Sequence, residues 1–145
     1  VLTTAPSDLN ANYVIENVNG GYVYDNGTNM SISNTYNYSN FFRFVSSDGG
    51  YKISNVKSSD FVVITTSWNS VSLNITQDAE SAATVFSIGS YNNNGFLISI
   101  RSGWTTYYWN KNNNNVRAST NNNNNSRWKI RKVTVDDSGI PNNPS

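Results

Sequence analysis

The chain has 145 residues, of which 37% are hydrophobic, 13% aromatic and 13% charged, with a formal net charge of +1. This composition is too apolar and too weakly charged for a disordered chain, and the length suits one domain with one core. Cysteine and histidine are both missing, which excludes disulfides, thiolate nucleophiles, serine–histidine pairs and the usual zinc sites. We therefore expect no metal and no cofactor.

The first elements of the chain are predicted to be short strands joined by turns. An arm at 1–12 precedes apolar and polar residues that alternate, the pattern of half-buried strands. Turns rich in asparagine and glycine separate these segments. The predicted strands span 13–18, 22–25, 30–34 and 41–45.

The sequence of the first predicted strand, at 13–18, recurs twice further along the chain. Tyr13-Val14-Ile15-Glu16-Asn17-Val18 returns as Tyr51-Lys52-Ile53-Ser54-Asn55-Val56 and, more loosely, as Phe96-Leu97-Ile98-Ser99-Ile100. Because a motif that recurs along a chain indicates a repeated structural unit, we divide the chain into three repeats and a tail. The repeats span 13–50, 51–94 and 95–133, and the polar tail spans 134–145.

Each repeat also ends on a similar apolar landmark. The closing segments are Phe42-Arg43-Phe44, Phe86-Ser87-Ile88 and Trp128-Lys129-Ile130, in which two apolar side chains flank one polar residue. Alternation along a strand sends the two apolar side chains to the core face. The predicted core therefore contains Ile15, Tyr22, Phe42, Phe44, Ile53, Phe86, Ile98 and Trp128.

Three units of four strands favour one fold class. Residues 78–83 are the one candidate for a helix, and they would form a single turn. A propeller blade has a similar length, but propellers typically have at least four blades. The sequence therefore predicts an all-β protein with a single domain at 1–145, a β-trefoil of three four-stranded repeats with pseudo-three-fold symmetry.

The repeats resemble those of the ricin-B-type trefoil lectins. The shared features are Tyr-x-Ile-x-Asn at the start of a repeat and an aromatic residue after a small polar residue at its end, where that family has Gln-x-Trp. The hairpin Thr105–Trp109 and the closing segment Ser126–Val133 are most similar to the small cysteine-free lectins of fungal fruiting bodies. The chain departs from the family pattern where the glutamine would stand, with Asn40, Thr84 and Ser126 in its place.

This resemblance implies sugar binding without catalysis. The expected partners are glycans or glycoproteins, carrying galactose or N-acetylgalactosamine, or else N-acetylglucosamine or fucose. A sugar offers hydroxyl groups and an apolar face, so a site needs amides or a carboxylate beside an aromatic ring. The candidate residues are Asp25, Asn26, Asn34, Tyr36 and Asn37 in the first repeat, Trp68, Asn69 and Asn74 in the second, and Tyr108, Trp109 and Asn110 in the third.

Two kinds of contact are predicted within this set. Trp68 and Trp109 each precede an asparagine in a hairpin, and we expect them to stack on sugar, with capping of the barrel or an interchain contact as alternatives. Asp25 is the only carboxylate at the hairpin position where ricin-like sites hold sugar hydroxyls. Any single asparagine could instead serve only its own turn.

The charge distribution and the predicted loops suggest functions other than sugar binding. The net charge is −4 over residues 1–100 and +5 over 101–145, but Arg127, Lys129 and Arg131 are expected to face outward as a solvated strand face, so we predict no nucleic-acid partner. The acidic residues are scattered, which argues against a glycosidase. The alternative function is a β-trefoil protease inhibitor that acts through an exposed loop at 76–84 or 111–115.

The sequence also gives expectations about localisation and assembly. No apolar run approaches the about 18 residues that a membrane helix needs, so we expect no membrane insertion. A chain without cysteine suits a reducing compartment, which predicts a cytoplasmic protein, with secretion as the alternative. We allow for a homodimer, and we expect the asparagine runs at 112–115 and 121–125 to be polar loops.

Overall fold

The computed structural model describes residues 6, 8–35, 37–67, 70–76, 80–91 and 94–133, and in this part of the chain it contains strands and three short 3-10 turns. None of these turns is long or apolar enough to cross a membrane. The strands are β1 (Asn12–Asn17), β2 (Tyr22–Asp25), β3 (Met30–Ser33), β4 (Phe42–Ser47), β5 (Gly50–Asn55), β6 (Phe61–Ser67), β7 (Ser70–Thr76), β8 (Ser87–Ser90), β9 (Phe96–Ser102), β10 (Thr105–Asn112), β11 (Asn115–Ser119) and β12 (Trp128–Val133). The turns are η1 (Tyr38–Asn40), η2 (Glu80–Ala82) and η3 (Asn124–Ser126).

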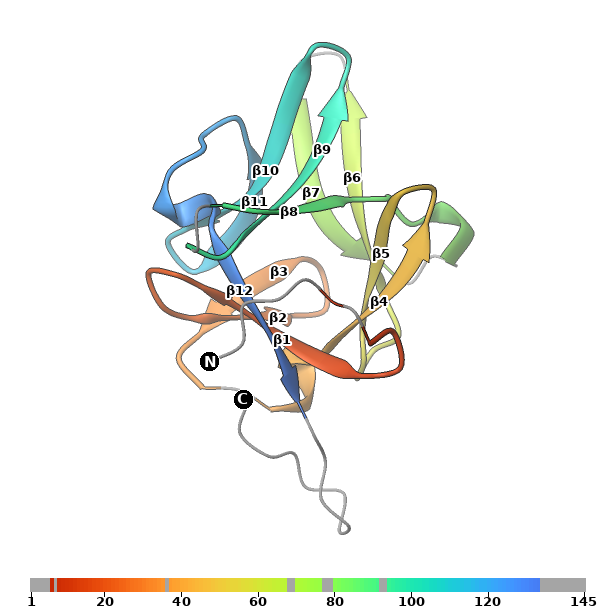
Figure 1. Cartoon of the computed structure of the whole chain (residues 1–145), viewed down its shortest axis with the longest axis vertical. Coiled ribbons are helices and arrows are strands. Elements are labelled where there is room, and N and C mark those ends of the chain that lie inside the picture. The colour runs from red at the N-terminus through yellow and green to blue at the C-terminus, as the bar shows by residue number, and fades with distance from the viewer. Residues whose placement is uncertain are drawn as a thin grey trace, which may run out of the picture.

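Six of the strands form a closed ring and the other six form hairpins (Figure 1). Around the ring, β1 pairs with β4, β4 with β5, β8 with β9, β9 with β12, and β12 with β1. A bridge between Tyr51 and Phe86 connects β5 to the segment before β8. The hairpins are β2–β3, β6–β7 and β10–β11. A ring leaves few strand edges open to pairing with other chains.

One pairing occurs in each of the three predicted units. The first residue of the repeated motif lies opposite the aromatic residue that begins the closing segment: Tyr13 opposite Phe42, Tyr51 opposite Phe86, and Phe96 opposite Trp128. The strands also fall four to each predicted unit. The predicted all-β class is therefore confirmed.

Two glycines show how closely these paired segments approach. A Cβ atom on Gly50 would lie 2.5 Å from the carbonyl oxygen of Phe86, and one on Gly95 would lie 2.6 Å from that of Trp128. Each glycine directly precedes the first residue of its unit's motif. Backbone contact with the closing segment leaves no room for a side chain there.

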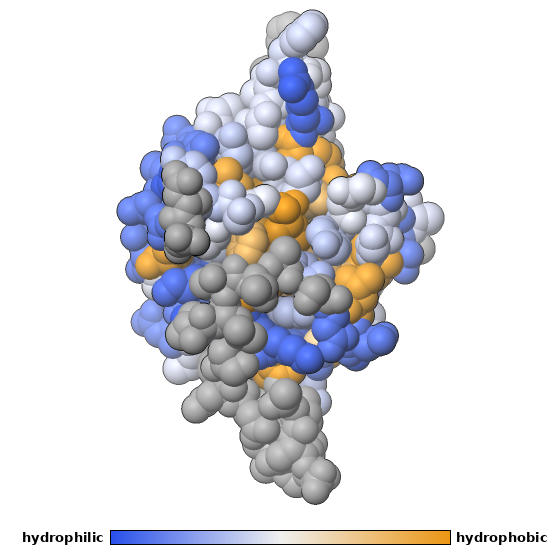
Figure 2. All heavy atoms as spheres, in the orientation of Figure 1, coloured by the Kyte–Doolittle hydropathy of each residue, from blue (hydrophilic) through white to orange (hydrophobic). Residues whose placement is uncertain are grey.

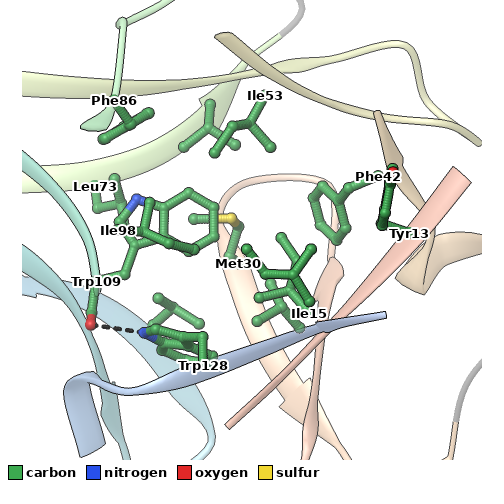
Figure 3. Close-up of a cluster of buried hydrophobic side chains, with 14 of the residues drawn as sticks. Tyr13, Ile15, Met30, Phe42, Ile53, Leu73, Phe86, Ile98, Trp109 and Trp128 are labelled. Carbon is green, nitrogen blue, oxygen red and sulfur yellow. Dashed lines mark hydrogen bonds between the residues drawn. The ribbon is translucent and has the colours of Figure 1, made fainter. Parts of the chain in front are cut away.

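The interior contains the predicted apolar landmarks (Figure 3). Ile15, Ile53, Ile98, Phe42, Phe44, Phe86 and Trp128 are all buried, which confirms these core predictions. Tyr22 was wrongly placed in this core: Val23 faces it instead, and Tyr22 is half-buried against a smaller cluster formed by Val14, Phe41 and Val133. Alternation along a strand allows only one of two consecutive residues to face the core.

The residues that stand where the ricin-B-type repeats have glutamine share one structural role. Each connects the segment before a closing strand to the second strand of the same unit through a side-chain hydrogen bond. Asn40 Nδ2 donates to Val23 O (3.0 Å), Thr84 Oγ1 accepts from Ile64 N (2.8 Å), and Ser126 Oγ accepts from Asn110 Nδ2 (2.8 Å). A shorter polar side chain therefore supports each hairpin.

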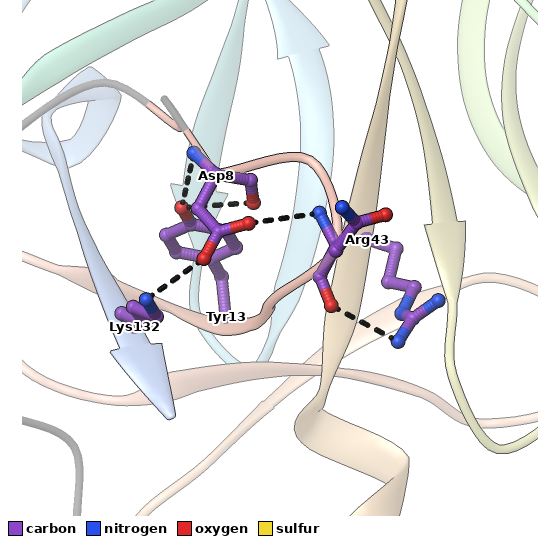
Figure 4. A network of polar contacts seen from close by, with 5 residues as sticks. Asp8, Tyr13, Arg43 and Lys132 are labelled. Carbon is purple, nitrogen blue, oxygen red and sulfur yellow. Dashed lines mark hydrogen bonds and ion pairs between the residues drawn. The ribbon is translucent and has the colours of Figure 1, made fainter. Parts of the chain in front are cut away.

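Polar contacts attach the end of the N-terminal arm to the barrel (Figure 4). The Asp8 backbone exchanges two hydrogen bonds of 3.2 Å with the Tyr13 hydroxyl, and Lys132 Nζ lies 2.8 Å from Asp8 Oδ2. The hydrogen bond from Lys132 holds the pKa of Asp8 below its usual value. On the other side, Arg43 Nη2 donates to Asn10 O at 3.2 Å. The arm is therefore connected to β1, β4 and β12.

The basic residues near β12 do not form the solvated face that we predicted. Arg127 is buried, because the chain before β12 turns through η3 and lays the guanidinium over the ring of Tyr91, 4.0 Å from its centroid. Arg131 forms an ion pair of 2.6 Å with Glu16. The outward placement of Arg127 was therefore wrong.

The surface of one face combines polar rims with an apolar centre. Figure 2 shows hydrophilic residues at the rims and apolar residues gathered between them. This is the ordinary distribution for a small protein whose turns are polar.

We predict that replacing a core isoleucine will cost far more stability than a change on the surface. Ile53→Ala should lower the free energy of unfolding by about 2–5 kcal/mol, because it leaves a cavity in a fully buried layer. Ser46→Ala, at an exposed position of β4, should change it by less than about 0.5 kcal/mol. Urea unfolding of both variants measures this, and equal costs would contradict the placement of Ile53.

Candidate functional site

A surface pocket of about 270 Å³ lies where the β2–β3 hairpin meets the turn between β5 and β6. Its walls are polar and include two carboxylates and a lysine. The lining residues are Asp25, Gly27, Ser39, Asn55, Lys57, Ser58 and Asp60. We call this the Asp25 pocket.

Asp25 is held in place from two sides. It ends β2, and its Oδ1 atom accepts a hydrogen bond of 2.7 Å from Gly27 N in the following turn. Its Oδ2 atom accepts one of 2.5 Å from the Ser58 hydroxyl, which comes from the neighbouring unit. Each carboxylate oxygen can accept a second hydrogen bond. The carboxylate is therefore oriented in advance and can still receive a ligand hydroxyl.

A buried asparagine shapes the opposite wall. Asn55, at the end of β5, donates from Nδ2 to Ser39 O (2.7 Å) and accepts at Oδ1 from the backbone N–H of Lys57 (3.0 Å) and Ser58 (3.1 Å). These bonds connect the turn after β5 to η1 of the preceding unit. The position of Ser58, and through it that of Asp25, depends on Asn55.

A second carboxylate lies beside the first. Asp60 is 6% exposed, and its pKa is raised above the usual value, first because burial disfavours the charged form and next because Asp25 carries the same charge nearby. Lys57 is the cation of the pocket. The pocket can therefore accept hydrogen bonds from hydroxyl groups and donate one from an ammonium group. Within the described ranges, no cluster of three or more acidic residues could hold a metal ion.

Asn26, Asn34 and Asn37, the other described candidates from the first repeat, do not line this pocket. Asn26 serves its own turn, accepting from Thr28 N and Asn29 N at 3.0 Å each, and Asn37 caps η1 through Ser39 N at 2.9 Å. Asn34 is exposed and follows β3. Because Asp25 ends β2 at the turn while Asn34 lies beyond the other end of the hairpin, about 13 Å of strand separates them. Of the members of this set that the structure describes, only Asp25 lines the pocket.

The amide candidates of the later repeats lie in strands. Asn74 is half-buried in β7 and donates to Ser72 Oγ at 3.3 Å. Asn110 is buried in β10, where it also accepts from Arg117 Nε at 3.1 Å, and Tyr108 is half-buried in the same strand. The structure therefore does not bring these residues to one site. Tyr36, Trp68 and Asn69 lie outside the described residues.

Trp109 is a core residue, and the prediction that it stacks on sugar was wrong. Its side chain is 1% exposed, and its ring meets Phe86 and Trp128 edge to face, at centroid distances of 5.6 and 6.4 Å. Trp128 Nε1 donates to the Trp109 carbonyl oxygen at 2.9 Å (Figure 3). A side chain this deeply buried cannot receive a ligand. The alternative of capping the barrel describes it better.

Sequence reasoning missed one tryptophan that is exposed. Trp104 occupies the tip of the β9–β10 hairpin, is 94% exposed, and has the Arg101 guanidinium 6.0 Å from its ring centroid. The signal was present in the sequence, because Gly103-Trp104 forms a two-residue turn between two alternating segments and such a tip cannot enter the core.

A second pocket of about 490 Å³ combines an aromatic ring with hydroxyl groups. It lies between the β6–β7 hairpin and the β10–β11 hairpin, with Tyr107 on one side and the bonded pair Ser67–Ser70 (2.6 Å) on the other. Tyr107 was also absent from the sequence-based candidates. The loop predicted at 111–115 is a tight two-residue turn at Asn113-Asn114, which is too short to serve as an inhibitor's probe loop.

We predict a large loss of stability when Trp109 is removed and almost none when Trp104 is removed. Trp109→Ala should lower the free energy of unfolding by about 3–5 kcal/mol, because a large ring leaves the core. Trp104→Ala should change it by less than about 0.5 kcal/mol. Urea unfolding monitored by circular dichroism measures both, and a well-tolerated Trp109→Ala would contradict the burial described above.

A further prediction concerns pH. Because the pKa of Asp60 in the folded chain lies above the usual 3.8, the folded state binds a proton more strongly than the unfolded state. The contribution of Asp60 to stability therefore rises as the pH falls from neutral through the raised pKa towards 3.8, and it is lost as the pH rises.

The variant Asp60→Asn isolates this contribution, since it lacks the titrating group. Its free energy of unfolding relative to the parent should be more favourable at pH 7 than at about pH 4.5, measured by urea unfolding at both values. The idea fails if the difference between variant and parent is the same at the two pH values.

Comparison with known proteins identifies the fold. No protein-family model and no curated protein matches the sequence. Among solved structures, the chain is similar to SeviL bound to the asialo-GM1 saccharide, with 17% identity, a TM-score of 0.62, and coverage of 83% of this chain and 95% of that one. It is also similar to the ricin B-like lectin of Macrolepiota procera in complex with lactose, with 14% identity, a TM-score of 0.66, and coverage of 90% and 98%. The chain therefore has the fold of the ricin B-like lectins.

Proposed function

We propose that this protein is a carbohydrate-binding lectin that holds a neutral sugar in the Asp25 pocket. The observation that carries the proposal is the carboxylate of Asp25, which Gly27 and Ser58 fix in a surface pocket while lone pairs remain for sugar hydroxyls. Hydrogen bonds between a charged carboxylate and hydroxyls are stronger than those between neutral groups. The similar structures were solved with saccharides, which supports the same class of ligand here.

We infer in addition that the fold is a β-trefoil with pseudo-three-fold symmetry. The support is the ring of six strands with three hairpins, and the pairing of motif and closing segment that recurs in each unit. Each hairpin also receives an equivalent side-chain bond from the segment before the closing strand. In this interpretation the chain contains three units at 13–50, 51–94 and 95–133.

The proposed ligand is a glycan that ends in galactose or N-acetylgalactosamine, or one that contains N-acetylglucosamine or fucose. The lactose bound by the Macrolepiota procera lectin favours the first group. The affinity for one monosaccharide should be weak, because a shallow pocket gains only a few hydrogen bonds. Several sites, or a homodimer, would raise the avidity on a glycoprotein.

The arrangement of the carboxylates favours binding over hydrolysis. A glycosidase needs two carboxyl groups about 5 Å or more apart on either side of the scissile bond. Asp25 and Asp60 line the same small pocket, and the charge of Asp25 is one cause of the raised pKa of Asp60, so the two carboxyl groups are neighbours and do not face each other across a sugar. We therefore propose a protein without catalytic activity.

Removal of the charge on Asp25 tests the proposed site. Asp25→Asn should weaken binding to the strongest glycan found on an array by about tenfold, the effect of losing about 1.4 kcal/mol of hydrogen bonding. Isothermal titration calorimetry with that glycan measures the change. Trp68→Ala in the same titration tests the sequence-based prediction that Trp68 stacks on the sugar.

The matched control is Asp48→Asn. Asp48 is exposed in the β4–β5 turn with φ at 48°, a conformation that asparagine adopts equally well. This variant should bind like the parent. Normal binding by Asp25→Asn would show that the sugar is held elsewhere, and an empty array beside inhibition in a protease panel would favour the inhibitor alternative.

A further inference from the structure

A pocket of different chemistry lies where the first predicted unit meets the third. It has a volume of about 470 Å³ and forms where η3 meets the turn between β1 and β2. Four asparagines and one arginine line it, and no carboxylate is among them: Asn19, Asn123, Asn124, Asn125 and Arg127. We call this the Asn–Arg pocket.

The Asn–Arg pocket, like the Asp25 pocket, depends on a buried asparagine at the end of a strand. Asn17 is buried at the end of β1, donates from Nδ2 to Asn125 O (2.9 Å), and accepts at Oδ1 from Asn19 N (3.0 Å). Asn55 makes the equivalent bonds to Ser39 and Lys57. Each asparagine thus joins a turn to the 3-10 segment of another unit.

Three of the four amides on the wall of the Asn–Arg pocket, those of Asn123, Asn124 and Asn125, use their oxygen atoms internally. Asn123 Oδ1 accepts from Asn125 N (3.1 Å), Asn124 Oδ1 from Arg127 Nη1 (2.9 Å), and Asn125 Oδ1 from Asn19 Nδ2 (2.8 Å). In the part of the chain that the structure describes, none of their Nδ2 groups donates to an acceptor. An amide nitrogen can only donate, so the wall offers three sets of N–H groups to a ligand.

The arginine of the pocket is buried without a counter-charge. Arg127 is 7% exposed, donates to Asn124 Oδ1 and to the backbone oxygen of Asn122 (3.3 Å), and rests on the ring of Tyr91. The ion pairs among the described residues join Arg131 to Glu16 and Lys132 to Asp8, and leave Arg127 unpaired. Buried charges in proteins normally have a partner of opposite charge.

A second cation strengthens the positive potential at this place. Lys111 Nζ donates to Gly20 O at 2.8 Å, on the same turn that carries Asn19. The pocket therefore combines N–H donors, a buried guanidinium and a neighbouring ammonium group. Only a ligand group that accepts hydrogen bonds and carries negative charge satisfies all of them.

From this chemistry we propose that the Asn–Arg pocket binds the carboxylate or sulfate group of an acidic saccharide. The saccharide part of the inference rests on the proposed lectin function, whereas the oxyanion part rests on the donors alone. The Asp25 pocket accepts hydrogen bonds from neutral hydroxyls, and the Asn–Arg pocket donates them to an oxyanion. The protein would then select glycans that carry an acidic group.

Three ligands that share one scaffold test this proposal. The parent protein should bind 3′-sulfolactose and 3′-sialyllactose about tenfold more tightly than lactose in calorimetric titrations, and added salt should reduce this preference. Sodium sulfate, titrated alone, separates the anion from the saccharide. If sulfate alone binds as tightly as 3′-sulfolactose, the saccharide part of the proposal is wrong.

The decisive variant is Asn124→Asp, which places a carboxylate where an amide oxygen already contacts Arg127. It should abolish the preference for the acidic ligands and raise the thermal midpoint, because the buried cation gains a partner. Ser46→Asp adds the same charge at an exposed position of β4 that is not part of the pocket lining, and it should retain the preference.

The outcomes separate this proposal from the lectin function. Equal affinity for lactose and its acidic derivatives, or a preference that survives in Asn124→Asp, overturns the Asn–Arg pocket and leaves the Asp25 pocket untouched. Conversely, if the acidic preference is lost in Asn124→Asp while Asp25→Asn binds lactose normally, the Asn–Arg pocket is supported and the proposed neutral site is wrong.

Discussion

The architecture of this protein depends on the pairing of its first strand with its last. Six residue pairs, from Asn12–Val133 to Asn17–Trp128, connect β1 to β12 and close the ring. Closure encloses the apolar landmarks of all three units in one core and leaves few strand edges open. It also places Asn17 beside Asn125, 108 residues further along the chain. The pocket at that junction therefore exists only in the folded barrel.

Two buried asparagines hold in place the turns that form the pockets. Asn17 and Asn55 occupy the same position in their units and use both ends of the amide, one to a 3-10 segment and one to the following turn. Burial without these bonds would be unfavourable, so the bonds hold the turns in one arrangement. The third unit has Ile100 at this position, and its turn projects as the hairpin that ends in Trp104. The two pockets differ in the residues that line them. Carboxylates line the Asp25 pocket, whereas amides and an arginine line the Asn–Arg pocket.

The tryptophans show how neighbouring positions on one hairpin reach opposite environments. Trp109 lies within β10, on the strand face that packs against Phe86 and Trp128, whereas Trp104 lies at the exposed tip of the hairpin. Both are followed or preceded by polar residues in the sequence, so polarity alone does not distinguish them. Distance from the hairpin tip does, because a side chain several residues along a strand returns to the barrel wall.

The sequence by itself determined the strands and the core. Local alternation and turn residues specify strands within a residue or two, and repetition at Ile15, Ile53 and Ile98 marks equivalent buried positions, since a strand's period assigns each side chain to a face. The tertiary structure decided the sites. Asp25 meets Ser58, and Asn19 meets Asn125, only because turns of different units are brought together, and Arg127 is buried because η3 folds it onto Tyr91. Contacts between distant segments depend on how the ring closes, and no local pattern of residues records that.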